Sequence, residues 1–182
     1  NTETWNGTAW SNVADMNTAR RQGTGDGTST SSVAFGGENA GTARISDTEL
    51  WNGTIWTESS NMNIGRGTSG SSGVQSSALA FSGDAHGQAL GSATESWNTG
   101  ITLGAWFTQT SLNTAREALD TVGTNTSALA FGGEIPPTGL SANTEEWNGS
   151  TWGEINNLNT ARRTLAGAGT STAGISFGGA IA

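Results

Sequence analysis

A pattern that repeats four times along the 182 residues constrains the fold more than any other feature. Each copy holds two tryptophans, an arginine ten residues after the second tryptophan, and a phenylalanine fifteen residues after the arginine. The first tryptophans recur every 46 to 50 residues, at Trp5, Trp51, Trp97 and Trp147. A period of this length indicates an array of supersecondary units, in which each unit needs its neighbours to bury its apolar face.

Each copy is expected to form four short strands. The two tryptophans flank an Asn-Gly turn in three copies, which favours a tight hairpin because both turn residues tolerate positive φ. The third copy has four inserted residues, and its hairpin is expected to have a longer tip that includes the unmatched aromatic Phe107. A second hairpin leads into the repeated phenylalanine, which Gly-Gly follows in three copies. The predicted fold class is therefore all-β, a β-propeller of four four-stranded antiparallel blades.

The order of these residues resembles the kelch repeat. In that repeat Gly-Gly closes the second strand, Glu-x-aromatic marks the third, tryptophan lies on the fourth, and arginine precedes the next inner strand. The corresponding residues in the last copy are Gly132, Gly133, Glu145, Trp147, Trp152 and Arg162. The chain departs from the kelch pattern in having tryptophan where the family usually has tyrosine, and in having four copies where kelch propellers commonly have more blades. The resemblance covers the whole chain, which is predicted to be one domain, residues 1–182, with units of about 1–46, 47–92, 93–142 and 143–182.

The ends of the chain are expected to share one blade. Its first strands, around Trp5 and Trp10, would be the outer pair of a blade, and its last strands, around Leu165 and Phe177, the inner pair. Pairing them would close a four-bladed ring and hide strand edges. Inner strands rich in Gly, Ala, Ser and Thr fit such a small ring. The alternatives are part of a longer propeller and a homo-oligomer in which two protomers make eight blades.

The composition restricts the partners. Fifteen acidic residues accompany seven arginines and no lysine, which disfavours binding to nucleic acid or to an anionic membrane surface. No segment approaches the roughly 20 continuous apolar residues of a membrane span. The absence of cysteine excludes disulfides and thiolate metal sites. No cofactor or metal is expected, because the carboxylates that follow Gly in three copies, Glu38, Asp84 and Glu134, are interrupted by Ala180 in the fourth.

The repeated arginine has two interpretations. A glutamate lies two residues before each first tryptophan, so arginine and glutamate occur in equal number and favour ion pairs between strands or blades. The alternative is a ring of arginines that presents an anion site at the channel rim. The arginines are Arg20, Arg66, Arg116 and Arg162, and the glutamates are Glu3, Glu49, Glu95 and Glu145. A second ring would be incomplete, since Arg21 and Arg163 follow directly in only two copies.

Loops that differ between copies are the preferred place for recognition. The connections between second and third strands lie at the same blade end as the arginine turns, because the four strands alternate in direction. Variable loops on a repeated scaffold usually carry binding. The candidate ligand-binding residues are Arg20, Arg21, Arg66, Arg116, Arg162, Arg163, Glu38, Asp84, His86 and Glu134, with Arg44, Asp47, Pro136 and Pro137 in the same loops.

The repeats are also similar to kelch-type repeats in large structural or appendage proteins of marine bacteriophages and bacteria. This resemblance implies a non-enzymatic tail-fibre or adhesion module on a virion or cell surface, which binds a glycan or a protein in a larger assembly. One alternative is a kelch-type enzyme such as a sugar epimerase; a hydrolytic triad would have to use His86, the sole histidine. Another is an adaptor that binds acidic peptides through Arg21 and Arg163.

Overall fold

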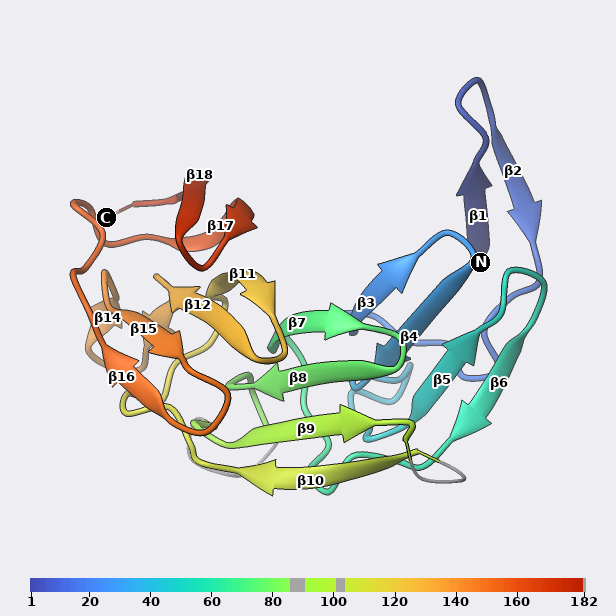
Figure 1. Ribbon diagram of the computed structural model, residues 1–182, viewed down its shortest axis with the longest axis horizontal. Helices are drawn as coiled ribbons and strands as arrows, with labels where there is room; N and C mark the ends of the chain where they lie inside the picture. Colours follow the sequence, from blue (N-terminus) through green and yellow to red (C-terminus); the bar gives the residue numbers. More distant parts are fainter. Residues whose placement is uncertain (86–90, 101–103, 182) are drawn as a thin grey trace.

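The computed structural model describes residues 1–85, 91–100 and 104–181, and within these ranges all regular structure is β. Three four-stranded antiparallel sheets follow one another along the chain (Figure 1). Blade 1 consists of β3 (Thr24–Thr28), β4 (Ser31–Phe35), β5 (Thr48–Trp51) and β6 (Trp56–Ser59). Blade 2 consists of β7 (Gly70–Val74), β8 (Ser77–Phe81), β9 (Thr94–Asn98) and β10 (Ala105–Gln109). Blade 3 consists of β11 (Asp120–Thr124), β12 (Ser127–Phe131), β15 (Thr144–Trp147) and β16 (Trp152–Glu154).

Two-stranded sheets flank the blades. The N-arm is the hairpin of β1 (Thr2–Trp5) and β2 (Trp10–Val13), and the C-arm is the hairpin of β17 (Arg163–Thr170) and β18 (Ala173–Ala180). A third small hairpin, β13 (Glu134–Ile135) with β14 (Gly139–Leu140), lies in the loop between β12 and β15. The prediction of four antiparallel strands per unit is confirmed for the three complete blades.

The Asn-Gly turns form the predicted hairpins. In blade 1, Trp51 lies opposite Trp56. Gly53 in the turn between them has φ of 91°, a backbone conformation that is strained for any residue with a side chain. The side-chain oxygen of Asn52 accepts hydrogen bonds from the backbone N–H of Thr54 at 2.9 Å and of Ile55 at 3.0 Å. The Asn-Gly turn therefore sets the register between the two strands that it joins. In the third copy, Phe107 lies within β10 and not in the hairpin tip, so that prediction was wrong; residues 101–103 of the tip are outside the described part.

The core lies between the blades and is built by the repeated aromatic residues. Phe35 of blade 1 contacts Trp106 of blade 2 with ring centroids 4.9 Å apart, and Phe81 of blade 2 contacts Trp152 of blade 3 in the same way at 4.7 Å. The indole N–H of Trp106 donates to the hydroxyl of Thr48 in blade 1 at 3.0 Å. Each blade therefore packs against its neighbour through equivalent side chains, because the repeat places them at the same positions.

The inner strands contact one another in the order β3, β7, β11, β17. Small residues are required there: a Cβ on Gly70 would lie 2.6 Å from the Phe81 ring and 2.8 Å from a methyl group of Thr121 on the next blade. Glycine and alanine in these strands thus allow the blades to approach each other closely.

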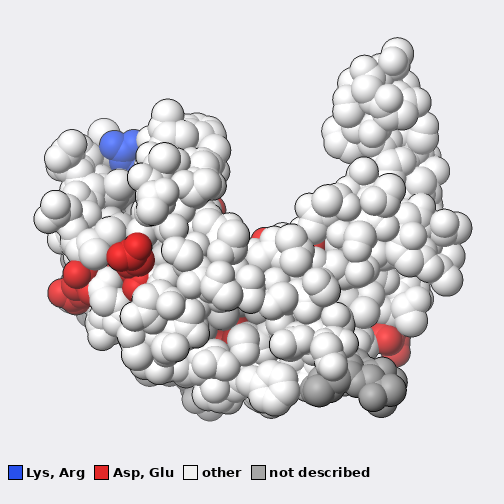
Figure 2. Space-filling view, in the orientation of Figure 1, with Lys and Arg blue, Asp and Glu red and all other residues white. Residues whose placement is uncertain are grey.

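The pairing predicted between the two ends of the chain is not present. The N-arm and the C-arm are separate two-stranded sheets, and they lie at opposite ends of an open arc (Figure 1). The arc has a U-shaped outline whose two arms face the same side (Figure 2). The structure therefore shows three whole blades and two half-blades.

Candidate functional site

The repeated arginines are buried and ion-paired in the three complete blades. The guanidinium of Arg66 donates to the carboxylate of Glu95 at 2.6 Å and to the carbonyl oxygens of Ser82 at 3.1 Å and Ala93 at 2.6 Å. Arg20 pairs with Glu49 in the same way, and Arg116 pairs with Glu145. The predicted arginine–glutamate ion pair is confirmed in these three units, and each pair lies within one blade.

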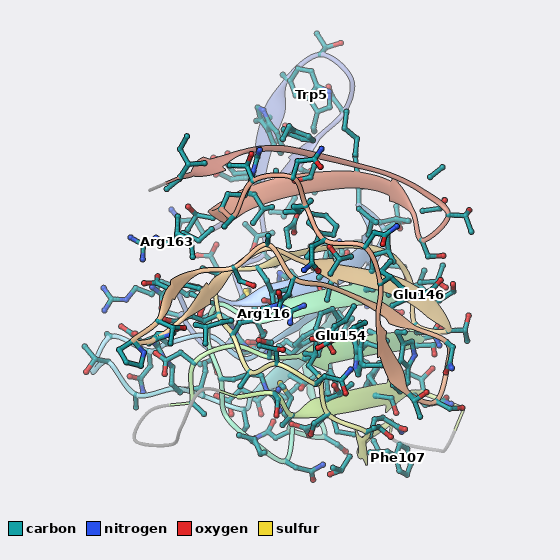
Figure 3. The ribbon with its side chains drawn as sticks, turned by 90° about the vertical axis from the view of Figure 1, so that its left-hand side faces the viewer. Trp5, Phe107, Arg116, Glu146, Glu154 and Arg163 are labelled. Atoms are coloured by element: carbon teal, nitrogen blue, oxygen red, sulfur yellow. The ribbon has the colours of Figure 1, made fainter. Side chains whose placement is uncertain are left out.

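Each glutamate of these pairs also holds a backbone turn. Glu95 accepts hydrogen bonds from the backbone N–H of Asn63 at 2.7 Å and of Ile64 at 3.3 Å. Burial lowers the pKa of Arg66 while Glu95 raises it, but a guanidinium stays protonated at neutral pH in either case. These arginines are therefore structural groups whose terminal NH2 groups donate inside the blade, while the buried Nε of each has no hydrogen-bond partner. Figure 3 shows Arg116 in the interior of the molecule.

The fourth arginine differs because its blade is incomplete. Arg162 donates to the carbonyl oxygens of Thr160 at 3.4 Å and Gly178 at 3.1 Å. Among the residues that the structure describes, no carboxylate pairs with it, and Glu3 is exposed on the N-arm at the other end of the arc. The four arginines therefore do not form an anion-binding ring in this arrangement.

The charged residues of the variable loops form a network along one rim of the arc, which we call the charged rim. Glu38 pairs with both Arg21 and Arg44, and Arg44 also pairs with Asp84 of the next blade. The hydrogen bond from Arg21 lowers the pKa of Glu38, and the charge of Arg44 adds to this effect. Burial acts against the charge of Arg44, but Asp84 and Glu38 raise its pKa overall. The network therefore links blade 1 to blade 2.

Backbone bridges explain why these side chains meet. Arg21 and Glu38 exchange hydrogen bonds between N–H and C=O at 2.9 and 2.8 Å, and Glu117 and Glu134 do so at 3.0 and 2.8 Å. The residue after each repeated arginine thus lies opposite the residue after each Gly-Gly pair. This register puts an arginine against a glutamate in blade 1.

In blade 3 the same register opposes two glutamates. Burial raises the pKa of Glu117, and the nearby charges of Asp84 and Glu134 raise it further, while Arg44 and Arg163 lower it. Arg163 of the C-arm pairs with Glu134, and Figure 3 shows Arg163 at the edge of the molecule. The charged rim thus runs from blade 1 to the C-arm, and three of its acidic residues, Asp84, Glu117 and Glu134, lie near one another between Arg44 and Arg163.

The structure separates the candidate site residues into two groups. The charged rim holds the exposed Arg21 and Arg163, the half-buried Asp84 and Glu134, and the buried Glu38. Arg20, Arg66 and Arg116 are inside the blades, Arg162 is at the open end, and His86 lies outside the described residues.

Sequence reasoning placed Arg44 in the variable loops but missed its central role, and it did not select Glu117. The signal for Glu117 was its position directly after Arg116, which is the position of Arg21 and Arg163 in their own copies.

A cavity of about 200 Å³ lies at the blade 1 end of the charged rim. Its lining includes Arg20, Arg21, Glu38 and Asn39. The side chain of Asn39 accepts hydrogen bonds from the backbone N–H of Gly41 and of Ala43, both at 3.0 Å, so the loop that walls this cavity is held by its own residues. The surface that the cavity exposes is mostly apolar, because the charged groups of Arg20, Arg21 and Glu38 are already used in ion pairs.

Comparison with known proteins gives no family: neither a family model nor a curated protein matches the chain. In the described ranges, no cluster of three or more His, Asp or Glu side chains is arranged to hold a metal ion. The same residues include no helix of the length and apolar character that a membrane-crossing segment requires.

Proposed function

We propose that this protein is a non-enzymatic binding or structural module of the kelch-like propeller type, which recognises a glycan or a protein at its charged rim. The observation that carries the proposal is that the repeated charged residues and the variable charged residues lie in different places. Arg20, Arg66 and Arg116 and their glutamates stabilise each blade from within, while the residues that differ between copies form the charged rim, on which Arg21 and Arg163 are exposed. A constant frame with variable loops is typical of recognition scaffolds.

The resemblance of the repeats to structural and appendage proteins of bacteriophages and bacteria supports a place on a virion tail fibre or a cell surface. In such an assembly the ends of the chain would be covered, and closure into complete blades remains part of this proposal. Closure within one chain, which gives four blades, stays a prediction.

The epimerase alternative is less well supported, because the arginines and glutamates that such chemistry would use form buried ion pairs in three units. The acidic-peptide adaptor has a specific observation in its favour: the side chains of Arg21 and Arg163 are exposed on the rim. Both already pair with a glutamate of the chain, so an acidic ligand would compete with Glu38 or Glu134 for them.

An array of immobilised glycans, read with and without calcium and at several salt concentrations, tests the proposal. We expect binding to at least one class of glycan, and we expect Arg21→Ala to weaken it by about tenfold, the effect of losing a charged hydrogen bond. Glu154→Ala, an exposed carboxylate on the outer strand β16, is the control and should bind as the parent does. An unchanged signal for Arg21→Ala would contradict the rim as the site, and a blank array would leave protein assembly as the function.

Acidic peptides give a separate test of the adaptor. Glu134→Ala frees Arg163 and should strengthen the binding of a poly-glutamate peptide, whereas Arg163→Ala should abolish it. Equal binding by both variants would remove this alternative.

A further inference from the structure

Both ends of the arc expose aromatic residues that the complete blades bury. Trp5 and Trp10 of the N-arm are 48% and 65% exposed, whereas Trp51 and Trp147, which occupy the position of Trp5 in complete blades, are 3% and 1% exposed. Phe177 of the C-arm is 51% exposed, although the matching phenylalanines of the blades are buried. Large exposed aromatic surfaces at two unpaired sheet edges indicate that these edges are covered in the assembled protein.

Each arm is already positioned as half of a blade. The indole N–H of Trp56 in blade 1 donates to the hydroxyl of Thr2 on the N-arm at 3.2 Å, as Trp106 does to Thr48 between blades 1 and 2. At the other end, β17 contacts β11 as β11 contacts β7. The N-arm is thus an outer pair of strands without its inner pair, and the C-arm is an inner pair without its outer pair.

The two arms are complementary in charge. In complete blades the arginine pairs with a glutamate 29 residues later on the third strand, as Arg116 does with Glu145. Arg162 would pair in the same way with Glu3 on β1. Glu3 lies two residues before Trp5, as Glu145 lies two residues before Trp147. Each arm therefore carries one member of an ion pair whose other member is on the other arm.

The repeat also fixes how the two arms would pair. In blade 1, β4 and β5 are antiparallel with Phe35 opposite Thr48 and Val33 opposite Leu50. Transferred to the arms, this register joins β18 to β1 in antiparallel pairing. The opposed residues would be Phe177 with Thr2, Ser176 with Glu3, Ile175 with Thr4, and Gly174 with Trp5.

We propose that the C-arm of one copy pairs with the N-arm of a second copy, and that two copies form a closed ring of eight blades. A half-turn of a second copy about the viewing axis of Figure 2 brings its C-arm to the N-arm of the first and its N-arm to the first copy's C-arm. The two joints are then identical, as a two-fold axis requires. The ring would hold six whole blades and two composite blades, and no sheet edge would remain open at the joints.

Cavities at both ends of the arc match the aromatic residues that would enter them. At the C-arm a cavity of about 230 Å³ is lined by Phe131, Thr144 and Ile175 among others. Trp10 of the second copy would enter it, because Phe131 and Thr144 occupy the positions of Phe81 and Thr94, which contact Trp152. The cavity therefore lies where the repeat would place the second tryptophan of the next blade.

At the N-terminal end a cavity of about 500 Å³ is bounded by blade 1, with Val33 and Trp56 in its lining. By the same repeat, Phe177 of the second copy would contact Trp56 there, as Phe35 contacts Trp106. Each cavity thus receives side chains from the opposite arm.

A second copy fits the observed contacts better than closure within one chain. The N-arm is tied to blade 1 through Thr2 and the C-arm to blade 3 through β11, so the two arms of one copy can meet only if the packing between blades changes. That packing includes the Phe35–Trp106 and Phe81–Trp152 contacts. The two-copy ring leaves every one of these contacts in place, whatever ligand the charged rim binds.

Cysteine cross-linking tests the joint directly, because the chain has no cysteine of its own. Thr4→Cys and Ile175→Cys are made as separate proteins, mixed and oxidised. Directly opposed residues of antiparallel strands have Cα atoms about 4.5 to 5.5 Å apart, which suits a disulfide. We expect a disulfide-linked product of two chains, each of 18.5 kDa, on non-reducing electrophoresis. As a control, Thr4→Cys is mixed with Ser176→Cys, whose side chain lies on the other face of the sheet, and this mixture should not cross-link.

The double variant Thr4→Cys with Ile175→Cys separates the outcomes. The proposal predicts a covalent two-chain ring. A cross-linked product of one chain, with no product from the mixed single variants, would show closure within the chain and overturn the proposal. A ladder of larger products would also overturn it, as would the absence of any cross-link.

Light scattering of the parent protein gives an independent readout, with two chain masses expected and a stable single mass contradicting the ring. Glu3→Gln and Arg162→Gln should each weaken the association by about 30-fold or more, because either change leaves a buried charge unpaired at both joints. Glu154→Gln, which lies outside the joint, should keep the parent mass. Full association in both joint variants would refute the predicted register.

Discussion

Replacement of Glu145 by glutamine should destabilise the protein by about 3–5 kcal/mol, because it leaves the charge of Arg116 buried without an anion. Both side chains of this pair are fully buried. Glutamine keeps the shape of glutamate but has one acceptor oxygen, whereas the N–H groups of Asn113 at 2.7 Å and Thr114 at 3.3 Å donate to different oxygens of Glu145. The expected loss is therefore due to the missing charge and one lost hydrogen bond, and not to packing. It is a large share of the roughly 5–15 kcal/mol that stabilises an ordinary domain.

The double variant Arg116→Met with Glu145→Gln isolates the ion pair. Removal of both charges leaves the carbonyl oxygens of Thr114 and Ala130, which Arg116 contacts at 3.1 Å each, without their donor, at a cost of about 1–3 kcal/mol each. Since no unpaired charge remains, we expect the double variant to be less destabilised than the sum of the two single variants by at least about 1 kcal/mol.

Equilibrium unfolding in urea, followed by tryptophan fluorescence at one fixed protein concentration, measures these differences. Glu154→Gln, on the same sheet but exposed, should change the free energy of unfolding by less than about 0.5 kcal/mol. The reasoning would be refuted if Glu145→Gln cost less than about 1 kcal/mol, or if the two single effects simply added in the double variant.

Three further predictions concern the strands. Burial raises the pKa of Asp26 to about 6 from 3.8. The contribution of Asp26 to stability should therefore be full below about pH 4 and be lost as the pH rises to about 6, by at most about 3 kcal/mol; thermal unfolding of Asp26→Asn against pH should lack this loss. Gly123→Ala should lower the urea midpoint, because its Cβ would lie 2.3 Å from the Ser127 carbonyl oxygen at φ of 120°, whereas Gly153→Ala, with no atom within 4 Å, should leave the midpoint unchanged. Trp147→Phe should cost at least about 2 kcal/mol in the same titration, since it leaves a void and removes the hydrogen bond to the Asn125 carbonyl; a smaller loss would argue against the packing described.

The hairpins, strand order and ion pairs could be predicted from the sequence because they depend on local spacing. The Asn-Gly turn sets which tryptophan opposes which, and the constant distance between Arg66 and Glu95 brings them together in every complete blade. The shape of the arc could not be predicted in this way. It depends on how closely inner strands approach, which atoms on both sides of Gly70 decide together.

The charged rim was predicted as a region but not as a network. Arg44 meets Glu38 and Asp84, and these partners lie on loops of two different blades. Spacing along one unit cannot show which loops of neighbouring units will touch. The position of Phe107 was misjudged for another reason. Phe107 follows Trp106 on its strand as Thr57 follows Trp56 in blade 1, so the insertion ends before it, and β10 accepts a phenylalanine that is 46% exposed.

The uniform contacts between blades have a consequence for how such a chain can change in length. Since Trp106 meets Thr48 and Trp152 meets Thr94 at the same distance of 3.0 Å, each boundary between units is interchangeable with the next. Duplication or deletion of one full period of about 46 residues would join two surfaces that already fit, whereas a gain of part of a period would be accommodated only in a hairpin tip, as in the third unit. The gene can therefore lengthen or shorten by whole units, and the number of blades becomes a heritable variable that requires no new interface.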